Sequence, residues 1–130
     1  MISRSRRFRS AIRMITVVYG VSLFVLTHVP LPEGAVVGHS DKAAHFLAYL
    51  VLTLLVSASL APDWPRLRFK IGLGLLSYGA LDEALQAIPV IQRHADVWDW
   101  VADGLGVGVG MVLVEWWYRR IHQESVNDRS

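Results

Sequence analysis

The sequence predicts an all-α, polytopic membrane protein: a bundle of four transmembrane helices with both termini cytoplasmic. Of its 130 residues, 53% are hydrophobic and 18% are charged, against about 25% charged residues in ordinary soluble domains. Four apolar stretches of 18 or 19 residues follow one another, at 12–29, 43–61, 71–88 and 100–118. At about 1.5 Å per residue, each helix approaches the roughly 30 Å hydrocarbon core of a bilayer.

The distribution of Lys and Arg predicts the orientation. Eleven of the 13 basic residues lie at one set of helix ends: Arg4, Arg6, Arg7, Arg9, Arg13, Arg66, Arg68, Lys70, Arg119, Arg120 and Arg129. Only Lys42 and Arg93 lie at the opposite ends. Because short loops rich in Lys and Arg stay cytoplasmic, we expect a multi-pass protein of the cytoplasmic (inner) membrane with the N- and C-termini inside.

Local signals support the first two helices. About 18 apolar residues in the first stretch exceed the usual 7–15 of a signal peptide, so we expect this stretch to be retained as a transmembrane helix. Pro30 and Pro32 end it. Ser40 is the expected N-cap of the second helix, and Asp41 lies in its first turn, where the helix dipole favours an acid.

The third and fourth helices have similar signals. The segment 61–65, Ala-Pro-Asp-Trp-Pro, is a tight turn that places the second and third helices side by side. Pro89 ends the third helix. Aromatic residues flank the fourth at both interfaces: Trp98, Trp100, Trp116, Trp117 and Tyr118. The predicted organisation is a basic cytoplasmic flank at 1–11, a transmembrane domain at 12–118 and a cytoplasmic tail at 119–130, frayed from Glu124 onwards.

Composition excludes several classes of function. The chain has no cysteine, which excludes disulfides, thiolate nucleophiles and cysteine-ligated metals. The basic residues are divided among three flanks without a recognisable nucleic-acid-binding module, so we expect no nucleic-acid partner.

The polar residues of each helix share one face, because residues three or four apart lie on the same side of a helix. On the second helix the polar face holds Asp41, His45, Tyr49 and Thr53. On the third it holds Asp82, Glu83 and Gln86, with Gly72, Leu75 and Gly79. On the fourth it holds Asp96, Asp99 and Asp103, followed by Gly106 and Gly110. We expect the two last glycines to pack closely against a neighbouring helix, and Val107→Leu beside them to be mild.

An ionised Asp near the centre of a membrane helix costs about 2.5–3.5 kcal/mol. The acids are therefore expected to point into the bundle at its outer end. Seven acids lie there, against the two permanent cations Lys42 and Arg93: Glu33, Asp41, Asp82, Glu83, Asp96, Asp99 and Asp103. Two interpretations stay open. The residues form a site for a ligand, ion or reaction, or they form a structural network in which Lys42, Arg93 and His45 neutralise the acids.

The same residues fall into four motifs that resemble those of the VanZ-like membrane proteins, in the same order. They are Asp41-Lys42-x-x-His45-Phe46-x-x-Tyr49, then Asp82-Glu83-x-x-Gln86, then Arg93 with Asp96-x-x-Asp99, and finally Asp99-x-x-x-Asp103-x-x-Gly106-x-x-x-Gly110. The last motif carries Asp103 where the family usually has Asn, which keeps an acceptor oxygen and loses the amide donors. The resemblance covers about residues 14–118. It implies a bacterial cell-envelope role, and the family takes its name from a protein associated with resistance to the glycopeptide teicoplanin.

Three functions are compatible with this pattern. The first is binding or modification of a membrane lipid or lipid-linked envelope precursor, in which Lys42 and Arg93 hold a phosphate. His45 with Asp82 or Glu83 then acts as base and acid, and the remaining ligand-binding candidates are Asp41, Tyr49, Gln86, Asp96, Asp99 and Asp103. Whether the protein is an enzyme stays open.

The second function is a non-enzymatic module that binds a cationic group or a divalent metal ion such as Mg²⁺, Mn²⁺ or Zn²⁺. The third is proton-coupled transport by intramembrane carboxylates, which with four short helices requires a homo-oligomer. Outside these residues, His28 is expected at the surface of the first outer connection. Glu115 is expected to pair with Arg119, four residues away.

Overall fold

The computed structural model describes residues 2–29, 39–88 and 96–127. In these residues the chain is helical, with short turns between elements. The elements are α1 (Ile2–His28), α2 (His39–Ser59), the short 3-10 helix η1 (Ala61–Asp63), α3 (Trp64–Gln86) and α4 (Val97–Asn127). The all-α prediction is confirmed for the described residues.

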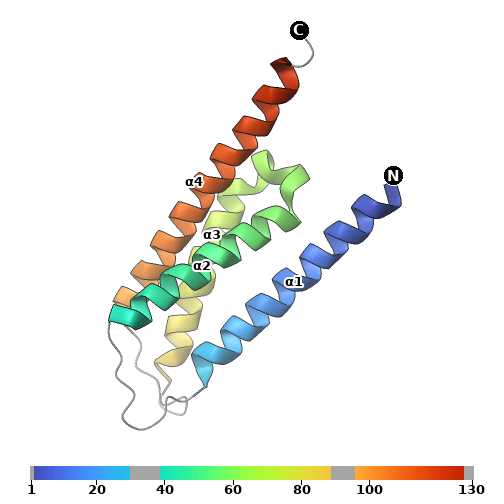
Figure 1. The fold of residues 1–130 in the computed structure, drawn as a ribbon. Coiled ribbons are helices and arrows are strands. Elements are labelled where there is room, and N and C mark those ends of the chain that lie inside the picture. The colour runs from blue at the N-terminus through green and yellow to red at the C-terminus, as the bar shows by residue number, and fades with distance from the viewer. Residues whose placement is uncertain (1, 30–38, 89–95, 128–130) are drawn as a thin grey trace.

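The helices run up and down, so that their ends meet at two opposite ends of the bundle (Figure 1). The last turn of α1, the first turn of α2, the last turn of α3 and the first turn of α4 lie at one end, called the polar end below. The start of α1 and the end of α4 both lie toward the opposite end. The most extensive helix contact is between α2 and α4; α1 packs mainly on α2, and α3 packs mainly on α4.

Three of the described helices are long and apolar enough to cross a membrane: α1 over Arg7–His28, α2 over Asp41–Ser59 and α4 over Val97–Ile121. On α1, valine side chains such as Val17, Val21 and Val25 are more than half exposed to the surroundings of the chain. An apolar, outward-facing surface of this kind is what a helix in contact with lipid requires. That α3 also crosses stays a prediction.

The helix boundaries differ from the expected ones. α1 begins at Ile2, because arginine is a good helix former and the basic flank simply continues the helix. α3 begins at Trp64, with Pro65 in its first turn, where the missing N–H has no helical partner to lose. α4 extends to Asn127, beyond the expected start of fraying at Glu124. α2 begins at His39, so Ser40 lies within the helix and the expected N-cap was wrong.

The core lies where α2, α3 and α4 meet. Its buried apolar side chains are Tyr49, Leu52, Trp64, Ile71, Leu75 and Val107. Val107 is 3% exposed, so the structure argues that Val107→Leu destabilises the protein, in place of the mild effect expected from the sequence. A larger side chain there enters a core that is already filled.

The two glycines of α4 allow its close contact with α2. A Cβ added at Gly106 would overlap the carbonyl oxygen of Phe46, and one added at Gly110 would lie 2.8 Å from the Cβ of Thr53. Real Cβ atoms do not approach other atoms so closely. The predicted packing role of Gly106 and Gly110 is therefore confirmed.

Candidate functional site

The outermost part of the polar end is an ion-paired group joining α2 to the start of α4. The ammonium nitrogen of Lys42 lies 2.5 Å from Oδ2 of Asp96 and 2.8 Å from Oδ1 of Asp99. The side chains of Lys42 and Asp96 are 37% and 38% exposed, whereas that of Asp99 is 6% exposed. Lys42 thus links an accessible carboxylate to a buried one.

Asp96 also shapes the start of α4. Its Oδ1 accepts a hydrogen bond of 2.9 Å from the backbone N–H of Trp98, as an N-capping side chain does. The hydrogen bond from Lys42, followed by that from Trp98, lowers the pKa of the Asp96 carboxyl below its usual range. Asp96 therefore has a structural task in addition to its predicted place in the site.

Beneath this group lies a buried pair between α2 and α4. Nδ1 of His45 is 2.9 Å from Oδ1 of Asp103, and the two side chains are 11% and 2% exposed. With a proton on Nδ1, His45 donates this hydrogen bond, and the carboxylate fixes the orientation of the ring. His45 and Asp103 thus join α2 to α4 by a direct side-chain contact.

Glu83 reaches the same place from α3. Its Oε2 accepts a hydrogen bond of 3.0 Å from the backbone N–H of Asp96. One candidate ligand atom from each of His45, Glu83 and Asp103 forms a group in which all atoms lie within 4.8 Å of one another. Three helices therefore bring a histidine and two buried carboxylates together, as the shared polar faces predicted.

Several buried polar atoms of this region have no hydrogen-bond partner among the described residues: Tyr49 OH, Glu83 Oε1 and Asp103 Oδ2. Gly79 shows how close two of these residues come. A Cβ added at Gly79 would lie 3.2 Å from Oδ2 of Asp103 and 3.4 Å from Cε1 of Tyr49. The missing side chain at Gly79 is what leaves space for Asp103 against α3.

Asp82 belongs to a second polar group, between α3 and α1. Its Oδ2 accepts a hydrogen bond of 3.0 Å from Nε2 of Gln86, and its Oδ1 accepts one of 2.9 Å from the hydroxyl of Thr27. Nδ1 of His28 lies 3.5 Å from the same Oδ1. Both oxygens of Asp82 are thus engaged by α1 and α3, in contrast to Glu83.

Sequence reasoning missed Thr27 and misplaced His28. His28 ends α1 with a side chain that is 15% exposed, so the expectation of a surface residue was wrong. A lone polar residue at the end of an apolar stretch has no periodic pattern that would indicate its partner. The one available signal was their position at the end of the first apolar stretch, which the sequence placed at the same end of the bundle as the acids.

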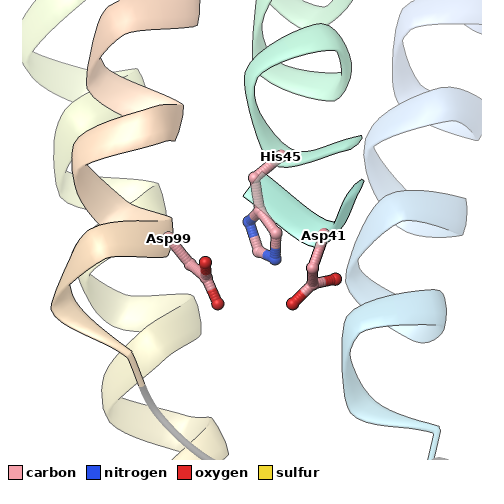
Figure 2. A group of neighbouring side chains, drawn as sticks. All are labelled: Asp41, His45 and Asp99. Atoms are coloured by element: carbon pink, nitrogen blue, oxygen red, sulfur yellow. The ribbon is translucent and has the colours of Figure 1, made fainter. Parts of the chain in front are cut away.

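Asp41 and Asp99 lie on either side of the His45 ring. Figure 2 shows their carboxylates facing each other, with one ring nitrogen directed toward the space between them. Candidate ligand atoms of these three residues also lie within 4.8 Å of one another. A cation at this second position would compete with Lys42, which already contacts Asp99.

The predicted site residues therefore divide as follows. The outer group consists of Lys42, Asp96 and Asp99. The group beneath it consists of His45, Glu83, Asp103 and Tyr49. The group that faces α1 consists of Asp82 and Gln86. Arg93 and Glu33 lie outside the described residues. Among the described residues of the polar end, Lys42 is the only permanent cation, and acidic side chains outnumber it.

A separate polar group lies at the opposite end. Glu115 accepts hydrogen bonds from Nε of Arg119 at 2.7 Å, from Nε1 of Trp64 at 3.1 Å and from Nη1 of Arg68 at 3.3 Å. The predicted pairing with Arg119 is confirmed. The contacts from Trp64 and Arg68 join α3 to α4 and give Glu115 a structural role.

Comparisons with models of protein families, with curated proteins and with solved structures found no match to this chain.

Proposed function

We propose that this chain is a VanZ-like integral membrane protein of the bacterial cell envelope, which binds or modifies a lipid or lipid-linked envelope component. In this proposal all four helices cross the cytoplasmic membrane, both termini are cytoplasmic and the polar end faces outward. A contribution to glycopeptide (teicoplanin-type) resistance belongs to the same proposal.

The observation that supports it most is the layering of the polar end. A half-exposed ammonium, that of Lys42, lies above a buried pair of His45 and Asp103. Lys42 is accessible enough to exchange a carboxylate for the phosphate of an arriving headgroup. A histidine held by a carboxylate is a common proton acceptor or donor in acid–base chemistry.

The main alternative is a structural network without chemistry, and one observation favours it. Lys42 already contacts the carboxylates of Asp96 and Asp99. The ring of His45 contacts the carboxylate of Asp103. Such pairs hold helices together in a membrane, because neither charge remains unpaired. A binding experiment separates the two interpretations.

The experiment uses the purified protein in nanodiscs of phosphatidylcholine doped with phosphatidylglycerol or with a polyprenyl phosphate. Native mass spectrometry measures the anionic lipid, phosphatidylglycerol or the polyprenyl phosphate, that each chain retains above phosphatidylcholine. We expect retention by the wild type and by Lys42→Arg, and a loss of about tenfold in Lys42→Gln, which corresponds to about 1.4 kcal/mol. Lys70→Gln is the matched control, since Lys70 is an exposed lysine of α3. Equal retention by Lys42→Gln and Lys70→Gln contradicts a role for Lys42 in binding.

A further inference from the structure

We propose that His45, Glu83 and Asp103 form a binding site for one divalent transition-metal ion of the Zn²⁺ or Mn²⁺ type. This site goes beyond lipid binding, because it requires neither Lys42 nor a phosphate. It is called the inner cation site below.

The first support is geometric. One ligand atom from each of the three residues lies within 4.8 Å of the other two. In tetrahedral geometry, ligands about 2.0–2.2 Å from a bound Zn²⁺ lie roughly 3.3–3.6 Å apart. Each of the three side chains therefore needs to move by less than about 1 Å to reach one ion. They come from α2, α3 and α4, so an ion would join three helices.

The second support is independent of the first: two carboxylate oxygens of the site have no partner. Oε1 of Glu83 and Oδ2 of Asp103 accept no hydrogen bond among the described residues. The two residues are 8% and 1% exposed. A buried carboxylate oxygen without a partner is costly, and buried polar atoms in folded proteins are nearly always satisfied. A cation bound by these carboxylates removes the penalty.

Gly79 directs the unpaired oxygen of Asp103 into the site. Gly79 lies one turn before Glu83 on α3. A Cβ added at Gly79 would lie 3.2 Å from Oδ2 of Asp103. Oδ2 therefore faces the surface of α3 that also carries Glu83. Asp103 thus lies against the face of α3 that carries both Gly79 and Glu83.

The ligand types indicate which ions the site prefers. An imidazole nitrogen suits Zn²⁺, and the two carboxylates also suit Mn²⁺, whereas Ca²⁺ and Mg²⁺ prefer oxygen ligands throughout. Mg²⁺ also releases its water with difficulty, and the buried position of Asp103 leaves little space for a hydrated ion. We therefore expect Zn²⁺ and Mn²⁺ to bind more tightly than Mg²⁺.

The neighbouring group of Asp41, His45 and Asp99 is the competing position for an ion. There Oδ1 of Asp99 is already 2.8 Å from the Lys42 ammonium. An ion at that position has to displace a bound cation or share a carboxylate with it. Among the described residues, no Lys or Arg contacts the inner cation site, which is why we favour it.

The test is a titration of the purified, chelator-treated protein in a non-ionic detergent with Zn²⁺, Mn²⁺ or Mg²⁺ alone. Isothermal titration calorimetry measures affinity and stoichiometry, and the electron paramagnetic resonance signal of Mn²⁺ gives a second readout. We expect one Zn²⁺ per chain, and at least tenfold weaker binding in Glu83→Gln and Asp103→Asn. Glu115→Gln, which removes a carboxylate at the opposite end, keeps wild-type affinity.

Other results overturn the inner cation site. One such result is the absence of saturable Zn²⁺ binding to the wild type. Another is a loss of affinity in Glu115→Gln equal to that in Glu83→Gln, and a third is a loss of affinity in Asp41→Asn that exceeds that in Glu83→Gln. Where Asp103→Asn yields no folded protein, Glu83→Gln carries the test, because its amide oxygen still accepts the hydrogen bond from Asp96. Lys42→Gln is expected to keep cation binding, so a failure of the lipid proposal is distinguishable from a failure of this one.

Discussion

The backbone of α4 at Gly106 lies against the carbonyl group of Phe46 in α2, with no space for a side chain between them. Asp103 is one turn before Gly106 on the same face of α4, and His45 directly precedes Phe46 on α2. The close approach of the two backbones is therefore what brings Asp103 to within hydrogen-bond distance of His45. Helix packing and the polar group depend on each other.

The first prediction follows from that contact. Gly106→Ala should lower the stability of the folded protein in detergent by about 1–3 kcal/mol, the usual effect of an overfilled interface. The matched control is Gly108→Ala, because a Cβ at Gly108 meets nothing within 4 Å. Thermal unfolding of both variants checks the prediction. Equal stability of the two would mean that α2 and α4 are not in this contact.

The second prediction concerns the link between α1 and α3. Thr27→Val removes the hydroxyl that donates to the buried carboxylate of Asp82. A hydrogen bond to a charged group is worth about 1.5–3 kcal/mol, so the unfolding free energy should fall by that amount. Thr27→Ser keeps the hydroxyl and should be mild. In an Asp82→Asn background the effect of Thr27→Val should shrink, since the acceptor is then neutral. An unchanged effect would show that Thr27 acts without Asp82.

Helix periodicity explains what the sequence could predict. Asp41, His45 and Tyr49 share a face, as do Asp103 and Gly106, because residues three or four apart always lie on the same side of a helix. The glycines indicated where two backbones approach. These signals depend only on local geometry, and they were sufficient to predict that His45, Glu83 and Asp103 meet at the polar end.

The partner that each polar side chain contacts on another helix could not be predicted from periodicity. That Asp82 turns to Thr27 on α1, whereas Glu83 turns to α4, depends on the rotation and tilt of each helix in the bundle. The same is true of Trp64, which contacts Glu115 across 51 positions of sequence. Periodicity gives the face of a helix, and tertiary packing decides which residue meets that face.

The third prediction concerns pH. The folded-state pKa of Asp96 is lowered, mainly by Lys42. The stabilisation that this gives is present above the unfolded pKa, near 3.9, and is lost as the pH falls through the lower folded value. Asp96→Asn should remove this part of the pH dependence. Melting temperatures in detergent between pH 6 and pH 2.5 check it. An unchanged slope below about pH 4 in Asp96→Asn would contradict the pairing with Lys42.

The fourth prediction concerns topology and follows from the partition of basic residues. Reporter fusions after Arg120 should be cytoplasmic, and fusions after Gly38 or Ala95 should be external, because loops rich in Lys and Arg stay inside. An alkaline phosphatase and a fluorescent-protein reporter, which are active on opposite sides, give complementary signals. An external reporter after Arg120 would reverse the proposed orientation of the polar end.

The central claim is that His45, Glu83 and Asp103 form a site and not a scaffold, and Glu83→Gln tests it most directly. The amide oxygen of Gln keeps the hydrogen bond from the backbone of Asp96, while the charge is lost. Relief of a buried charge should leave the unfolding free energy unchanged or raised. At the same time, Glu83→Gln should fail to complement the envelope-stress or glycopeptide-sensitivity phenotype of a deletion strain.

The measurement is the unfolding free energy of Glu83→Gln in detergent, made alongside that complementation assay. The account predicts a stable protein that fails to complement. A destabilisation of about 3–5 kcal/mol, typical of a broken buried ion pair, that is recovered in the double variant with Arg93→Gln would contradict it. Glu83 would then serve only to neutralise a cation.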